Sequence, residues 1–144
     1  MLNTKIKIMV FGTFDVLHKG HLNFFSQARK LAQNPFLIVS VARDANVKKI
    51  KKIKPLYSEK LRLAKVKKIT GVNRAVLGSR NDYIGHILKE KPQIIALGYD
   101  QRAYTTHLSK LLKARGLLVK IRRLKPFMPK KYKSSLFKAK SGII

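Results

Sequence analysis

The stretch GTFDVLHKGHLNFF, residues 12–25, follows directly on the largely apolar run IKIMVF at residues 6–11. It opens with a glycine, carries two histidines three positions apart and continues with apolar residues at helical spacing. An apolar run, a glycine turn and an amphipathic helix in this order predict a β-strand that passes into a helix. Asp15 lies three positions before His18, so polar groups gather at the same junction. The stretch therefore predicts both a fold class and the position of a site.

Short β-rich segments alternate with longer segments of helical period along the whole chain. We predict strands at residues 5–11, 36–42, 73–78, 93–97 and 117–124, and helices at 20–33, 58–70, 82–90 and 103–115. In the first helix a core stripe is predicted from Leu22, Phe25, Ala28, Leu31 and Ala32. This alternation predicts an α/β fold with a doubly wound, parallel, five-stranded sheet of Rossmann-like type. Ligands of such sheets bind beyond the carboxyl ends of the strands.

Composition narrows the class of protein. The 144 residues, 45% of them hydrophobic, fit one domain spanning residues 1–144. The chain has no cysteine, which excludes disulfides, cysteine-based zinc sites and a thiol nucleophile. It contains neither an apolar run of membrane-spanning length nor a signal-like N-terminus, so we expect a cytoplasmic protein.

The formal net charge of +27 is extreme for a chain of this length. A positive field of this kind attracts polyanions, so the protein could bind nucleic acid. The alternative is that the lysines are simply spread over solvated faces and have no binding role. Only six acidic residues are present, and three of them, Asp15, Asp44 and Asp100, follow directly on predicted strand ends. We therefore expect the site at these strand ends.

Two basic segments interrupt the alternation. The segment NVKKIKKIKPLYS, residues 46–58, is too long for a tight turn, and we expect a mobile loop close to a polyphosphate. Residues 125–144 form a basic C-terminal segment, in which Ser134 or Ser135 could cap a short helix.

The junction after the first strand suits an anionic ligand. Gly12 and Gly20 lack a Cβ and permit close approach of a ligand to the backbone. The start of a helix adds N–H donors and the positive end of its dipole. His18 and His21 lie on one helical face, donate hydrogen bonds in either tautomer and can carry a proton beside a phosphate.

Metal binding and core packing are the alternative roles for the two histidines. Asp15, His18 and His21 could hold a metal ion, although no fourth ligand is suggested nearby. Core packing is disfavoured, because Leu17 and Leu22 already supply apolar contacts on either side. Phosphate binding is the interpretation that the residues favour.

The same residues carry a resemblance to a known family. GTFDVLHKGH, residues 12–21, resembles the HxGH signature of the nucleotidyltransferase superfamily, in its cytidylyltransferase-like branch. VARDANVKKIKKIKP (residues 41–55), VLGSR (76–80) and IIALGYDQ (94–101) are similar to archaeal FAD synthases, which are FMN adenylyltransferases. The resemblance extends from about Ile6 to Phe137.

The resemblance implies transfer of the AMP moiety of ATP to FMN, with Mg²⁺ as the divalent cation and a homodimer as the assembly. A glycerol-3-phosphate cytidylyltransferase that uses CTP is the nearest alternative, although Tyr99 stands where those enzymes tend to carry a second acid. The alternative of another class is a basic nucleic-acid-binding module on the same fold. If the chain is the FMN adenylyltransferase that the resemblance implies, we expect it to bind nucleic acid only non-specifically, through its basic surface.

The resemblance also implies roles for individual residues. The catalytic group would be His18, His21, Lys48 and Arg62, with Lys49 an equal candidate to Lys48. The nucleotide would contact Gly12, Thr13, Phe14, Asp15, His18, Lys19, Gly20, His21, Gly98, Asp100, Tyr132, Ser134 and Ser135. Asp15 would orient the site or help to hold the cation that the nucleotide carries. Lys133 departs from the pattern, because the relatives usually have serine there.

Overall fold

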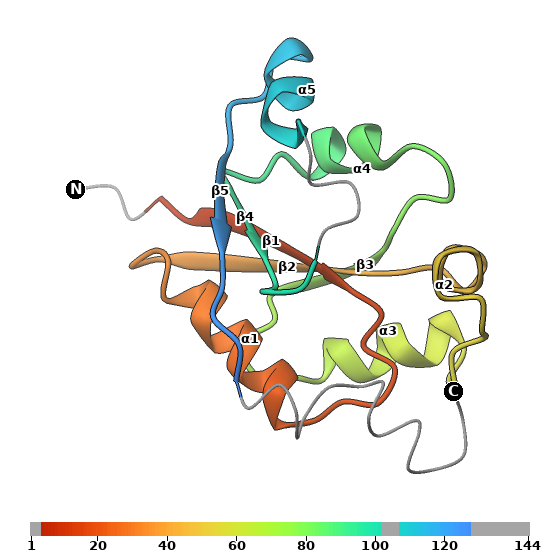
Figure 1. Ribbon diagram of the computed structural model, residues 1–144. Helices are drawn as coiled ribbons and strands as arrows, with labels where there is room; N and C mark the ends of the chain where they lie inside the picture. Colours follow the sequence, from red (N-terminus) through yellow and green to blue (C-terminus); the bar gives the residue numbers. More distant parts are fainter. Residues whose placement is uncertain (1–3, 102–106, 128–144) are drawn as a thin grey trace.

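A single parallel sheet of five strands forms the centre of the computed structural model, which describes residues 4–101 and 107–127. The strands are β1 (Ile6–Gly12), β2 (Pro35–Val41), β3 (Arg74–Leu77), β4 (Ile94–Leu97) and β5 (Lys120–Arg123). Their order in the sheet is β3-β2-β1-β4-β5, and each neighbouring pair is parallel (Figure 1). The predicted fold class is thus confirmed.

Helices cover both faces of this sheet. They are α1 (Lys19–Arg29), α2 (Asp44–Lys51), α3 (Glu59–Lys67), α4 (Tyr83–Glu90) and α5 (Leu108–Ala114). In Figure 1, α1 and α3 lie on one side of the sheet, and α4 and α5 lie on the other. Among the described residues, no helix has the length and apolar character that crossing a membrane requires.

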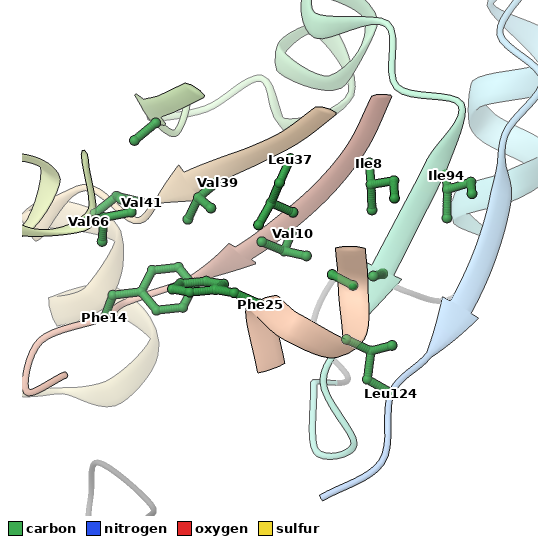
Figure 2. Packing of buried hydrophobic residues seen from close by; sticks show 13 residues of the cluster. Ile8, Val10, Phe14, Phe25, Leu37, Val39, Val41, Val66, Ile94 and Leu124 are labelled. Atoms are coloured by element: carbon green, nitrogen blue, oxygen red, sulfur yellow. The ribbon is translucent and has the colours of Figure 1, made fainter. Parts of the chain in front are cut away.

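Two hydrophobic clusters result from this layering, because successive residues of a strand face opposite sides of a sheet. Ile8 and Val10 of β1 point into the cluster under α1 and α3, together with Phe14 and Phe25 (Figure 2). Met9, between them, faces α4 and α5. Both faces of the central strands are buried, which explains why β2 and β4 read as nearly continuous apolar runs.

Strand β1 lies at the point where the chain reverses its direction of travel across the sheet. It pairs with β2 on one side and with β4 on the other. The chain first crosses outward from β1 to β3 and then continues from β4 to β5. The segments after β1 and β4 therefore diverge at the carboxyl edge of the sheet, which is where doubly wound proteins bind ligands.

The basic segment at residues 46–58 was wrongly predicted to be a loop throughout. Its first part belongs to α2, and only the connection from Lys52 to Ser58 is irregular. The lysine run hides the helix, because Val47 is its one buried residue and gives no apolar stripe. Asp44 in the first turn and lysines in the last turn nevertheless complement the helix dipole.

The first helix is also shorter than predicted. It ends at Arg29, and Leu31 and Ala32 pack against the core from beyond its end. The prediction for Leu22 was wrong, because 50% of its surface is exposed. Phe25 and Ala28 are the buried residues of this helix. Tyr132, Ser134, Ser135 and the predicted C-terminal helix lie outside the described residues, as does the predicted start of the helix at 103–115.

Candidate functional site

The side chains of the two histidines both accept backbone hydrogen bonds at the start of α1. His18 is the N-cap residue, and its Nδ1 accepts a hydrogen bond of 3.0 Å from the backbone N–H of Gly20. The backbone N–H of His18 in turn donates to Nδ1 of His21, at 3.3 Å. The arrangement is a capping box in which imidazoles take the places of the usual hydroxyl and carboxylate. The spacing of three residues is what permits this exchange.

These hydrogen bonds determine the tautomer of both rings. A neutral imidazole carries its proton on one nitrogen and accepts with the other. Because both Nδ1 atoms accept from backbone N–H groups, Nε2 is the protonated nitrogen in His18 and in His21. The ring centroids are 4.0 Å apart, with 35° between the planes. The site thus holds two adjacent rings, each with an Nε2–H donor.

Both imidazoles are held in the neutral form. Burial lowers the pKa of His18. Burial also lowers the pKa of His21 to about 3, with smaller contributions from the nearby charges of His18 and Lys51. At neutral pH the pair therefore offers hydrogen bonds without net charge. Protonation of either ring beside a bound phosphate stays a prediction, because a nearby anion raises the pKa of an imidazole.

His21 also packs against the core, although core packing was disfavoured from the sequence. Its ring meets the edge of Phe14, with 5.5 Å between centroids. Phe14 is only 3% exposed, and its ring fills the space that a Cβ at Gly12 would need, 2.6 Å from the ring carbon Cζ. Gly12 therefore leaves room for this ring, and close approach of a ligand to its backbone stays a prediction. Any nucleotide contact of Phe14 would come from its backbone.

Asp15 ties the junction to the connection before α3. The carboxylate is buried, and its two oxygens accept hydrogen bonds from the backbone N–H groups of Leu56 at 2.6 Å and Tyr57 at 2.8 Å. This contact supports an orienting role for Asp15. In the described part of the chain, no group of three His, Asp or Glu side chains is arranged to hold a metal ion.

Arg62 is the largest fully buried side chain in the described chain. Its guanidinium donates to the carbonyl of Thr13 at 2.8 Å, the carbonyl of Tyr57 at 3.0 Å and Oδ1 of Asp44 at 2.6 Å. These contacts join the loop after β1 to the starts of α2 and α3. They favour a positioning role, and a direct contact of Arg62 with phosphate stays a prediction.

Helix α2 contributes the cations of the site. Lys48 and Lys49 are both exposed in its last turn, so the two remain equal candidates for the predicted phosphate contact. Lys51 was missed from the sequence, yet its charge is one of the causes of the low pKa of His21. Its position three residues after Lys48, on the same helical face, is the signal that could have identified it.

The loop after β4 is fastened by a residue that the sequence did not single out. The Gln101 side chain accepts from the N–H of Gly98 at 2.8 Å and donates to the carbonyl of Phe11 at the end of β1. Arg123 donates to the carbonyls of Gly98 and Gln101. Asp100 is exposed between these anchors. The carboxyl ends of β1 and β4 are thereby linked where the nucleoside was expected.

Most of the chain matches one protein family. A family model described as cytidylyltransferase-like covers residues 9–140. This chain belongs to the cytidylyltransferase-like family. The predicted resemblance is confirmed, and the match includes β1 from Met9 onward, both histidines, α2 and the loop after β4.

Curated members of the family resemble the chain over most of its length. A FAD synthase of Korarchaeum cryptofilum is 46% identical over 128 residues, which cover 88% of this chain and 86% of that protein. A FAD synthase of Methanosarcina mazei is 45% identical, with 82% and 76% covered. A protein of Thermoplasma volcanium named for lipopolysaccharide core biosynthesis has a solved structure with a TM-score of 0.78, 35% identity and coverage of 85% and 98%.

Proposed function

We propose that this cytidylyltransferase-like protein is an FMN adenylyltransferase, a FAD synthase that transfers the AMP moiety of ATP to FMN. The relatives named FAD synthase, 46% and 45% identical, support this choice of substrates. The observation that carries the proposal is the pair of rings of His18 and His21, each held with Nε2–H as donor. Such fixed donors suit a triphosphate whose negative charge shifts during reaction.

The reaction needs no covalent enzyme intermediate. A phosphate oxygen of FMN attacks the α-phosphorus of ATP, and a new P–O bond forms. The bond from that phosphorus to the bridging oxygen of the β-phosphate breaks, and pyrophosphate leaves with the electron pair. Catalysis then consists of positioning and charge stabilisation, as in phosphoryl transfer generally. The neutral pair of His18 and His21 would donate to the phosphate oxygens, and Lys48 and Lys51 would supply positive charge.

The remaining site residues would shape the two ends of the pocket. Asp15 and Arg62 hold the loop after β1 in place for the phosphates. Gly98 and Asp100 would face the nucleoside at the end of β4. The proposed contacts of Tyr132, Ser134 and Ser135 with the nucleotide lie in the part of the chain that the structure does not describe.

We propose that Mg²⁺ enters as the complex with ATP, as part of the substrate. Both oxygens of Asp15 already accept backbone hydrogen bonds, so this residue does not fit a resident metal ion well. Phosphate oxygens are the ligands that Mg²⁺ commonly uses in nucleotide enzymes.

We also retain the homodimer as a proposal. Large apolar side chains stand exposed in α5 and in the segment that leads into the outer strand β5, with Leu111 at 50% and Leu118 at 75% exposure. An interface there would cover apolar surface at a sheet edge. Sedimentation at moderate salt that shows only a monomer would contradict this proposal.

A competition experiment tests the function. Equal ATP and CTP are offered with FMN and glycerol 3-phosphate together, and all products are separated chromatographically. We expect FAD and pyrophosphate as the main products. CDP-glycerol as the main product would mean that the substrates are CTP and glycerol 3-phosphate. The protein would still be a nucleotidyltransferase. Absence of turnover with every pair would favour the nucleic-acid-binding alternative.

A further inference from the structure

We propose that Asp44 and Glu59 are positioning residues, which lock α2 to α3 so that the lysines of α2 face the triphosphate. The inference rests on the proposed function for the nucleotide that occupies the site. It assigns a task to two acids that neither contact the histidines nor belong to the expected nucleotide pocket.

The two acids cap each other's helices. The backbone N–H of Asp44 donates to Oε1 of Glu59 at 2.9 Å, and the backbone N–H of Glu59 donates to Oδ2 of Asp44 at 3.2 Å. Each carboxylate thus satisfies an N–H at the start of the other helix and lies at the positive end of its dipole. Seven residues connect the end of α2 to the start of α3, and the two acids join the first turns of these helices.

The remaining carboxylate oxygens bind two arginines. Oδ1 of Asp44 accepts from Arg62 at 2.6 Å, and Oε2 of Glu59 accepts from Arg43 at 3.3 Å. All four carboxylate oxygens of the pair therefore have a donor. Arg62 continues the network to the carbonyl of Thr13, in the loop between β1 and α1 that leads to His18. One chain of hydrogen bonds thus connects the loop after β1 with both helices.

The lock supplies much of what holds α2 in place. Its N-cap residue, Arg43, makes no side-chain capping bond, and Val47 is the one buried residue of the helix. Besides the lock, Arg43 donates to the carbonyl of Gly78, and Asn46 donates to the carbonyl of Ser79. Burying one valine contributes about 1.5–3 kcal/mol, which is little for a helix that has three lysines in its last turn and a fourth, Lys52, at its C-cap.

The composition of the chain makes this use of acids informative. Only six acidic residues are present against 33 lysines and arginines, and Asp15, Asp44 and Glu59 all serve the network around the site. The lock contains two carboxylates and two guanidiniums, so it is neutral in a strongly positive molecule. Lysines that lie close together repel each other and favour separation of α2 from its basic surroundings, so an attachment at the first turn of α2 is needed to keep the helix in place.

Isosteric substitutions test the lock. Asp44→Asn and Glu59→Gln each replace one acceptor oxygen with an amide nitrogen and leave the size unchanged. The dissociation constant for ATP–Mg²⁺ is measured by calorimetry without any acceptor. We expect each variant to weaken binding about tenfold, because a shift of a charged group by about 1 Å is costly. Wild-type affinity in both variants would overturn the inference.

A matched control separates positioning from general stability. Asp82 caps α4 by accepting from the N–H of Gly85, so Asp82→Ala removes a side-chain cap from a helix away from the lysines. We expect it to lower the free energy of unfolding by about 1 kcal/mol while the ATP dissociation constant stays within about twofold of wild type. Equal weakening of ATP binding by Asp82→Ala and Asp44→Asn would overturn the inference.

A double-mutant cycle shows whether the acids act through the lysines. In a Lys48→Met, Lys51→Met background, adding Asp44→Asn should weaken ATP binding less than about twofold, because residues that act as a unit are not additive. A persistent tenfold loss would place the effect of Asp44 elsewhere and overturn the inference. Wild-type protein that binds ATP but makes no FAD would overturn the proposed function alone, since this cycle uses no acceptor. Wild-type protein that binds neither ATP nor CTP would overturn both.

Discussion

Acidification should destabilise this protein through His21, and the size of the effect follows from the structure. The pKa of this imidazole falls from 6.5 to about 3 on folding, chiefly because the ring is buried against Phe14. Between about pH 6.5 and pH 3, His21 is protonated in the unfolded chain but neutral in the folded chain. Stability is therefore fully present above pH 6.5 and decreases as the pH falls toward 3.

The magnitude can be worked out from the pKa difference. Each unit of pH below 6.5 removes about 1.4 kcal/mol from the free energy of unfolding, until the folded protein also binds the proton. Between pH 7 and pH 5 the loss from His21 is thus about 2 kcal/mol. This loss is a large fraction of the stability of a typical small domain.

Urea denaturation at pH 7 and pH 5 measures this loss in wild type and in His21→Asn. Asparagine keeps an oxygen to accept from the N–H of His18 but does not titrate. The variant should be less stable at pH 7 and should lose about 2 kcal/mol less than wild type on acidification.

Other titrating groups are common to wild type and variant, so the difference between them isolates His21. An equal loss of stability in both proteins would refute the argument that burial keeps this histidine neutral. The ¹H NMR shift of its imidazole Cε1 proton gives a second measurement. It should stay unchanged between pH 7 and pH 5, and a midpoint near pH 6.5 would contradict the same reasoning.

Three further predictions concern the packing and the donors of the site. His18→Asn keeps a side-chain cap but removes the Nε2–H donor, so turnover should fall by about 10²-fold or more while the melting temperature changes little. Gly12→Ala should lower the free energy of unfolding by about 1–3 kcal/mol in urea denaturation, because the new Cβ overlaps the Phe14 ring. Arg62→Met should cost about 1–3 kcal/mol in the same assay, because the carbonyls of Thr13 and Tyr57 lose their donor, whereas the Asp44 carboxylate is 43% exposed to water. An unaltered midpoint would contradict either stability prediction.

Much of the fold was predictable because it depends on local pattern. Strand β1, the start of α1 and the alternation of the remaining elements follow from apolar spacing and from glycine and proline positions. Helix α2 escaped prediction because its stability comes from caps and charge placement, which give no apolar stripe. The exposure of Leu22 was missed for a related reason: apolar residues at helical spacing do not reveal how wide the buried face is.

The histidine pair was predictable as a unit but not in its details. Three-residue spacing brings His18 and His21 onto one helical face, and the structure confirms that their rings are adjacent. Their tautomers and the low pKa of His21 depend on backbone donors and on burial. Spacing carries no information on either.

Sequence pattern was enough to predict which residues lie at the carboxyl edge of the sheet, since parallel strands place their carboxyl ends together whatever the loops do. What those residues contact depends on how the elements pack in three dimensions. Asp15 reaches backbone donors 41 and 42 positions away, and Arg62 reaches Thr13 across 49 positions. The Phe14 ring packs against Gly12, where a Cβ would overlap it, and Phe14 itself has a positive φ of 53°. Contacts between distant segments arise from the packing of whole elements, and local sequence pattern does not encode them.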